Sequence, residues 1–191
     1  MRHSHLLAST SKTKPDHFDM ASQNLLMQAG YVTPLQQDHY ALMHLGIRLR
    51  HRIQVAIADA IDDLGGAEIS LPVAQPRELR HGMLRHRIET GGAALPVWKD
   101  LNGRSLLWPA DHETIMATLA KKHVDSYRQL PKLSFQVQPV FLDTIQPQTS
   151  TFAGRREHMI QVYGFSESEV AMQDQYKAVV NAMTKTLQSL G

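Results

Sequence analysis

The sequence predicts an α+β domain in which helices flank a mostly antiparallel sheet. Apolar residues recur at helical spacing between Gly46 and Leu64, as on a helix with one buried face. Two apolar runs separated by turn-forming residues lie between Val140 and Phe165, which is typical of a long hairpin. A second helical stripe follows at the C-terminal end. Because helices alternate with hairpins, we expect them to share one core.

The composition indicates one globular domain. The 191 residues are 42% apolar and 20% charged, which is typical of a folded chain. No apolar run approaches the roughly 18 residues that a membrane span needs. Cysteine is absent, which excludes disulfides, thiolate zinc sites and thiol catalysis and fits the cytoplasm. A net charge of +2 and a pI near 8.9 allow a nucleic-acid or phosphate partner without requiring one.

The first half predicts two helices, a hairpin and a strand. A short helix, MASQNLLMQA, is expected between Asp19 as its cap and Gly30 as its end. YVTPL and HYALM then form a hairpin. The long helix from Gly46 to Leu64 ends at Gly65. Its apolar stripe consists of Leu49, Ile53, Ile57, Ile61 and Leu64. AEISLPV follows as a strand, and because Pro72 cannot donate to a ladder, we expect this strand at an edge or an interface.

The second half predicts a loop-rich excursion over residues 77–104, then a short strand, LLW, and a helix that Asp111 is placed to cap. LSFQV is a strand that stops before Pro139, and the long hairpin comes next. The last helix starts with a capping box from Ser166 to Glu169. Its core stripe consists of Met172, Tyr176, Val179, Met183, Leu187 and Leu190.

Several of these blocks, in this order, resemble the N-terminal catalytic region of prolyl-tRNA synthetases, which are class II aminoacyl-tRNA synthetases. LGIRLRHRIQVAIADAIDDLGGAEISLPVAQPREL resembles the first class II motif, a long helix and a strand that ends in proline. PADHE lies where the family has its Thr-x-Glu substrate loop. SYRQLPKLSFQVQ leads into the second motif, which is the long hairpin. The resemblance covers nearly the whole chain and implies a single class II aminoacyl-tRNA synthetase-like core domain over residues 1–191.

The chain also departs from the family's pattern. The second motif begins Phe-Arg-Asp-Glu in the family, and here residues 141–144 read FLDT. In the family the returning strand carries a Lys-Asp pair, and in this sequence Ile160 and Gln161 occupy those two positions. The third motif, the editing insertion and the anticodon-binding domain have no counterpart. A fixed guanidinium suits the negative charge that spreads over the phosphate during amino-acid activation. The resemblance therefore implies that Leu142 replaces the central ATP contact, and losing one such donor costs roughly 100- to 1000-fold in rate.

The same resemblance implies the candidate site residues. Glu113 matches the Glu of the Thr-x-Glu loop and would receive a substrate ammonium group, and Asp111 replaces the Thr. The alternatives are a first-turn carboxylate favoured by the helix dipole for Glu113 and a plain N-cap for Asp111. Arg155 and Arg156 are candidates for a vestigial phosphate-binding site, with a solvated basic pair as the alternative. No catalytic residue is assigned.

A basic patch lies at the start of the long helix, at Arg48, Arg50, His51 and Arg52. It is either a weak RNA contact or a hydrated polar face. The histidines lack the spacing of a metal motif, so no metal site is expected. No cofactor is expected either, unless activity is retained, in which case ATP with Mg²⁺ would be needed.

Two functions remain open. The first is a free-standing paralogue of the prolyl-tRNA synthetase core that does not aminoacylate tRNA on its own and acts as an interaction or regulatory protein, or as a binder of a small amino acid. The second is the N-terminal part of a split or truncated proline–tRNA ligase that activates an amino acid with ATP. Leu142 favours the first, because a second chain cannot restore the second motif.

A basic subunit of a nucleoprotein assembly is a third class of function that stays open. We expect a homodimer through the helix from Gly46 to Leu64 and the strand through Pro72, because the family pairs its subunits there and a two-fold contact lets one patch bury itself. Another protein chain and weakly bound RNA are further candidate partners, and no membrane is expected.

Overall fold

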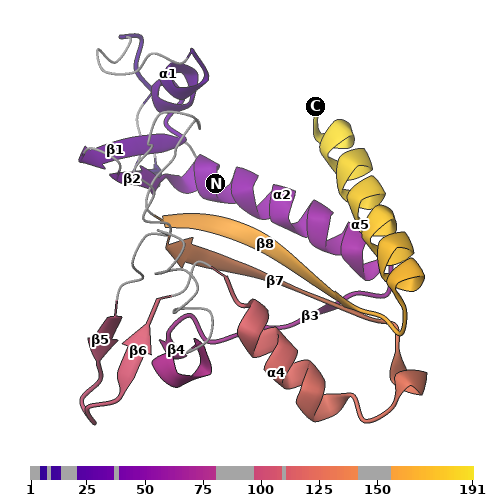
Figure 1. The fold of residues 1–191 in the computed structure, drawn as a ribbon. Helices are drawn as coiled ribbons and strands as arrows, with labels where there is room; N and C mark the ends of the chain where they lie inside the picture. Colours follow the sequence, from indigo (N-terminus) through magenta and orange to yellow (C-terminus); the bar gives the residue numbers. More distant parts are fainter. Residues whose placement is uncertain are drawn as a thin grey trace.

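The computed structural model describes residues 5–7, 10–13, 21–36, 39–80, 97–108, 111–141 and 156–191. A long hairpin forms a central layer, with two helices on one face and one helix on the other (Figure 1). The predicted α+β class is confirmed. The elements are α1 (Ala21–Gln28), β1 (Val32–Gln36), β2 (His39–Leu42), α2 (His44–Asp62), β3 (Ala67–Glu68), β4 (Gln75–Pro76), the 3₁₀ helix η2 (Arg77–Arg80), β5 (Val97–Lys99), β6 (Ser105–Leu107), α4 (Glu113–His123), the 3₁₀ helix η3 (Tyr127–Gln129), β7 (Lys132–Phe141), β8 (Arg156–Phe165) and α5 (Glu169–Leu190).

The central layer is a hairpin in which β7 and β8 pair antiparallel from Lys132↔Phe165 to Phe141↔Arg156. The predicted hairpin is confirmed in its second strand, but its first strand begins at Lys132 and not at Val140. The short β3 adds a parallel edge at Ser134 and Phe135. The predicted strand AEISLPV is confirmed as an edge strand only at Ala67 and Glu68, and Pro72 lies outside it. The expectation that LSFQV stops before Pro139 is wrong, since β7 continues through it. Pro139 lies beyond the two residues that β3 covers, so its missing N–H leaves no gap in that ladder.

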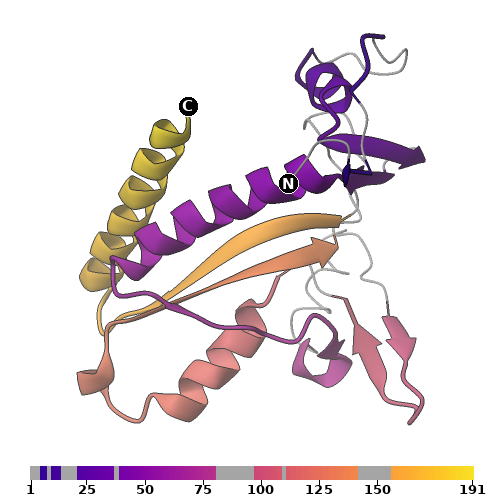
Figure 2. The same ribbon diagram turned by 180° about the vertical axis from the view of Figure 1, so that it is seen from behind.

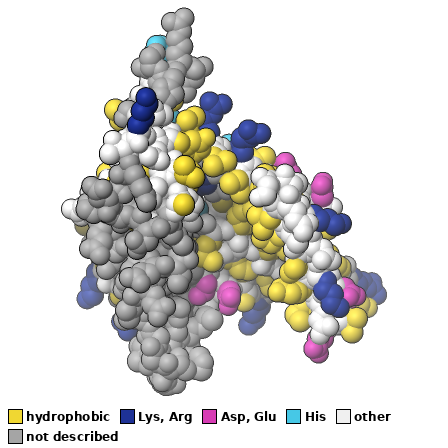
Figure 3. Space-filling view, turned by 90° about the horizontal axis from the view of Figure 1, so that it is seen from above, with side chains coloured by type: hydrophobic (Ala, Val, Ile, Leu, Met, Phe, Trp, Pro, Cys, Tyr) yellow, Lys and Arg dark blue, Asp and Glu magenta, His cyan; other side chains and the backbone are white. Residues whose placement is uncertain are grey.

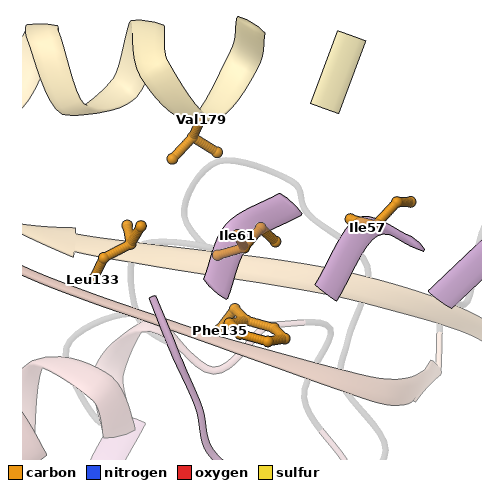
Figure 4. Packing of buried hydrophobic residues seen from close by; sticks show 5 residues of the cluster. All are labelled: Ile57, Ile61, Leu133, Phe135 and Val179. Carbon is orange, nitrogen blue, oxygen red and sulfur yellow. The ribbon is translucent and has the colours of Figure 1, made fainter. Parts of the chain in front are cut away.

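The larger apolar core lies on the face of the hairpin that α2 and α5 cover (Figures 1 and 2). In it, Ile57 and Ile61 of α2 meet Val179 of α5 over Leu133 and Phe135 of β7 (Figure 4). These positions confirm the centre of the predicted α2 stripe. Its two ends do not reach the core, because Leu49 and Leu64 remain 44% and 40% exposed.

A smaller apolar cluster lies on the opposite face, under α4. Its buried members are Leu71, Ile115 and Met116, and Tyr163 and Phe165 of β8 pack against them. Alternate residues of a strand point to opposite faces, so β8 presents Ile160 and Val162 to one cluster and Tyr163 and Phe165 to the other.

Two smaller sheets complete the described structure. β1 and β2 form the predicted hairpin, and the helix before it ends at Gly30 with a φ of 72°. β4, β6 and β5 form a second antiparallel sheet. The expectation of a loop-rich excursion over residues 77–104 is wrong for β5, whose three residues pair with β6 because a tight turn at Asp100 to Arg104 brings the strands together.

The last helix begins at Glu169, the last residue of its predicted capping box. Ser168 is the N-cap, and its hydroxyl accepts a hydrogen bond from the backbone N–H of Ala171 at 3.2 Å. The predicted core stripe is wrong over most of its length. Val179 is buried, but four other members stay exposed by about half or more: Met172, Tyr176, Leu187 and Leu190. Leu187 and Leu190 lie beyond Val179, where α5 leans away from α2, whereas Met172 and Tyr176 lie before Val179 in the helix (Figure 1).

Candidate functional site

The candidate site lies where the N-terminus of α4 meets the β7–β8 hairpin. The predicted role of Asp111 as the cap is wrong, because the helix begins one residue later and His112 is the N-cap, without a capping side-chain bond. Asp111 is half-buried, and its backbone oxygen accepts a hydrogen bond from Gln75 Nε2 at 3.5 Å. Glu113 is the first residue of α4 and its side chain is exposed, where the positive end of the helix dipole favours a carboxylate.

His112 was not predicted as a site residue, yet its side chain is 1% exposed and reaches the sheet. Its Nδ1 lies 3.1 Å from Oε1 of Gln161 on β8. Because an amide oxygen only accepts, this contact requires the hydrogen of the imidazole on Nδ1. His112 therefore links the predicted substrate loop to the strand that returns from the second-motif hairpin.

Gln161 is the centre of a polar group that we call the glutamine cluster, made of His112, Gln136, Gln161 and Tyr163. His112 and Gln136 are buried, and Gln161 and Tyr163 are half-buried. Gln136 Nε2 donates to Gln161 Oε1 at 2.7 Å and lies 3.2 Å from the hydroxyl of Tyr163. The same hydroxyl donates to Gln161 Oε1 at 3.1 Å. Gln136 and Gln161 are direct partners across the ladder, so the strand register alone brings them together.

Glutamines of β7 also hold the segment that follows β3. Gln136 Oε1 accepts a hydrogen bond from the backbone N–H of Leu71 at 3.4 Å, and Gln138 Nε2 donates to the carbonyl of Leu71. Gln136 is fully buried and Gln138 is 7% exposed. Buried polar groups need such partners, so these side chains replace strand pairing where β3 has ended.

The glutamine cluster is neutral when the imidazole carries one hydrogen. It offers amide, hydroxyl and imidazole groups, which can hydrogen-bond a polar ligand but supply no fixed positive charge for a phosphate. Arg156 begins β8 opposite Phe141, and its side chain lies outside the described residues, as do Arg155 and Leu142. The structure thus brings together Asp111, Glu113 and the glutamine cluster, and leaves the predicted phosphate-binding pair untested.

The predicted basic patch is divided in the structure. Arg50 turns toward β8, where its Nη1 lies 3.0 Å from Nε2 and 3.2 Å from Nδ1 of His158. Arg48, His51 and Arg52 remain exposed on α2. Arg50 is therefore a half-buried link between the helix and the hairpin, and the other three are exposed.

A cavity of about 630 Å³ lies at the opposite end of the sheet, away from the candidate site. It is bounded by the C-terminal half of α4, the end of β8 and the start of α5, with Lys121, Phe165, Glu169 and Met172 among its lining residues. It includes neither Asp111 nor Glu113. Within the described ranges, no group of three or more His, Asp or Glu side chains is arranged to hold a metal ion, and no helix is long and apolar enough to cross a membrane.

No family model matches the chain. The whole chain is 30% identical to proline–tRNA ligase of Acidithiobacillus ferrooxidans, 31% to that of Chromobacterium violaceum and 28% to that of Psychrobacter arcticus. In each case it spans about a third (33%) of the relative's length.

Among solved structures, the fold matches a Giardia lamblia prolyl-tRNA synthetase in complex with prolyl-adenylate. The TM-score is 0.70 at 16% identity, over 83% of this chain and 34% of that one. A Cryptosporidium parvum prolyl-tRNA synthetase with halofuginone and AMPPNP gives 0.69 at 12% identity, over 83% and 33%. The resemblance to a class II prolyl-tRNA synthetase core is confirmed.

Proposed function

We propose that this chain is a binding protein built on a prolyl-tRNA synthetase-like core, and that it does not activate an amino acid on its own. The glutamine cluster carries this proposal. Its neutral side chains, His112, Gln136, Gln161 and Tyr163, hydrogen-bond to one another on the face next to the substrate loop. The sequence adds Leu142 where the family has an arginine. Neither the cluster nor Leu142 supplies a fixed cation, and phosphoryl chemistry depends on such a charge next to the phosphate.

ATP–pyrophosphate exchange tests this proposal directly. The purified chain, supplied with ATP, Mg²⁺ and each amino acid in turn, should give exchange at the background rate. The proline–tRNA ligase of Acidithiobacillus ferrooxidans, prepared in the same way, serves as the positive control. Exchange by the chain alone at a rate comparable to that control would refute the proposal.

Glu113 is the group that we propose to contact a ligand. It is exposed and directly follows His112 of the cluster in the chain, and a carboxylate can pair with the ammonium group of a small amino acid or amine. Asp111 beside it would repel the ligand's own carboxylate, so a more cationic ligand should be preferred.

Calorimetry with a set of amino acids and amines tests the role of Glu113. We expect weak binding that Glu113→Gln reduces. Glu169→Gln is the matched control, because it makes the same change in the first turn of α5. A complete absence of binding heat and of thermal shift across the set would show that no amino-acid site survives.

The alternative is that the chain is one part of a split or truncated proline–tRNA ligase. It is favoured by one observation: the whole chain aligns with only a third of each relative. Affinity purification of the tagged protein from its own cells, followed by mass spectrometry, separates the two proposals. A co-purifying chain with a Gly-rich third motif would favour the split enzyme, and exchange activity of the pair would establish it.

A further inference from the structure

The cavity of about 630 Å³ at the far end of the sheet, which we call the α4–α5 cavity, has the size of a ligand pocket. It is lined by the second half of α4, the end of β8 and the start of α5 (Figure 1). Hydrogen bonds fix these segments. The backbone N–H of Val124 donates to the carbonyl of Ala120 at 2.8 Å and ends α4. Gln175 of α5 donates to the carbonyl of Lys132 and accepts from the hydroxyl of Ser166, both at 3.3 Å. The cavity is therefore formed before any ligand arrives.

The inner part of the α4–α5 cavity is apolar, and its rim carries opposite charges on its two sides. Val124 and Phe165 are half-buried in the lining. Lys121 is exposed on the α4 side, and Glu167 and Glu169 are exposed on the α5 side. Among the residues that the structure describes, Lys121 forms no ion pair with either carboxylate. The rim can therefore pair with a ligand that carries both signs of charge.

Met172 extends the apolar interior to the surface. Exposed apolar side chains alone do not mark a site on this protein, because the face that α2 and α5 form shows several of them next to charged side chains (Figure 3). Tyr176, for example, is 70% exposed but lies outside the cavity lining. Met172 differs because it is 49% exposed and also lines the cavity. A methionine is flexible enough to pack against partners of different shape.

We propose that the α4–α5 cavity binds a short segment of a partner protein. One apolar side chain of that segment would lie in the cavity, against Phe165 and Met172. An acidic residue on one side of it would pair with Lys121, and a basic residue on the other side would pair with Glu167 or Glu169. This proposal goes beyond the proposed function, because the cavity includes neither of the two carboxylates of the substrate loop.

Charge and shape favour a protein segment over other occupants. Glu167 and Glu169 would repel the phosphate backbone of a nucleic acid. Six of the eleven lining residues are exposed, so the cavity is an open trough, whereas sites for small molecules bury most of the ligand. A peptide can place one side chain in the trough and pass its neighbours over both sides of the rim. Charged contacts at such a rim set orientation and specificity.

Selection of a seven-residue peptide library, displayed on phage, against the purified protein tests this proposal. We expect the enriched peptides to carry a large apolar residue between an acidic and a basic residue. Met172→Asp places a charge in the apolar lining and should weaken binding of an enriched peptide at least about tenfold in fluorescence polarisation. Val170→Asp is the matched control, because Val170 is 71% exposed on α5 and lies outside the lining. It should bind the peptide as the wild type does.

Charge reversal at Lys121 tests the order of charges. Lys121→Glu should lose affinity for the enriched peptide and regain it when the acidic residue of the peptide is replaced by lysine. Lys122→Glu is the matched control, because it makes the same change at the next exposed residue of α4, outside the lining. It should show neither effect. Urea unfolding of each variant separates a loss of binding from a loss of folding.

Three results would overturn the proposal: a library without enriched peptides, peptide binding that Met172→Asp leaves intact, and a Lys121→Glu variant that the altered peptide does not rescue. None of them bears on ATP–pyrophosphate exchange or on amino-acid binding at Glu113, so the proposed function stands or falls separately.

Discussion

Replacing Gln161 by leucine should destabilise the protein through the glutamine cluster. Leucine is close in volume to glutamine, so the change removes hydrogen bonds without opening a cavity. Gln161 Oε1 accepts from Gln136 at 2.7 Å and lies 3.1 Å from His112 Nδ1. Gln136 keeps the hydroxyl of Tyr163 at 3.2 Å. The change removes the acceptor of two donors, His112 Nδ1 and the Tyr163 hydroxyl, and the larger loss falls on His112, because it is 1% exposed and Tyr163 is half-buried.

The size of the loss follows from these contacts. A buried donor left without its acceptor costs about 1–3 kcal/mol. For a chain of 150–250 residues, each kcal/mol lowers the melting temperature by about 2–4 °C, so Gln161→Leu should lower it by roughly 2–12 °C. Urea unfolding followed by circular dichroism gives the free energy of unfolding. Gln173→Leu on α5 is the control, because its amide makes only an exposed contact of 3.5 Å with Glu169.

A double-mutant cycle assigns the loss to the contact itself. His112→Ala and Gln161→Leu should be non-additive, with the double variant less destabilised than the two single losses together by about 0.5–3 kcal/mol. If Gln161→Leu unfolds at the same urea concentration as Gln173→Leu, the glutamine cluster does not stabilise the fold, and the reasoning from its hydrogen bonds is refuted.

Three further predictions concern the scaffold. Ile61→Ala should lower the free energy of unfolding by about 2–5 kcal/mol, because Ile61 is fully buried, and a loss below about 1 kcal/mol in urea would contradict the core described above. Ser168→Ala should lower the free energy of unfolding by about 0.5–2 kcal/mol. Ser168→Gly should lower it less, because glycine is a better N-cap residue than alanine. The backbone N–H of Arg104 and then its side chain lower the pKa of Asp100, so the carboxylate should stabilise the fold above its ordinary pKa and lose this effect as the pH falls through the lowered value. The difference in urea midpoint between the wild type and Asp100→Asn should disappear at pH values below the lowered pKa of Asp100. A difference that is equal at every pH would contradict this prediction.

The elements that could be predicted from the sequence are those whose signal is local. The α2 helix follows from the spacing of Ile53, Ile57 and Ile61, and the β7–β8 hairpin from two apolar runs around a turn-rich segment. β5 was missed because three residues carry too little periodicity, and its strand exists only through pairing with β6. Exposed members of the α5 stripe could not be distinguished from buried ones, since that depends on how the helix leans from α2.

The candidate site was predicted only in part, for a similar reason. Asp111 has the right chemistry for a cap, but the backbone makes His112 the N-cap. The glutamine cluster depends on the register that sets Gln136 opposite Gln161, and no local pattern encodes register between segments this far apart. One signal was available: Gln136 and Gln138 alternate with apolar residues in LSFQVQ. This alternation predicts a polar face on β7, but it does not predict which residues that face contacts.

The two apolar clusters have a consequence for the order in which the protein opens. They lie on opposite faces of the hairpin and share none of their described members. The α2 side has five buried residues and the α4 side three. Amide hydrogens of α4 should therefore exchange with solvent sooner than those of α2, because local opening begins where fewer apolar contacts must be broken. A ligand bound at Glu113 would slow amide exchange in α4 and leave exchange in α2 unchanged. Binding would then change the local stability of one face of the hairpin without changing that of the other face.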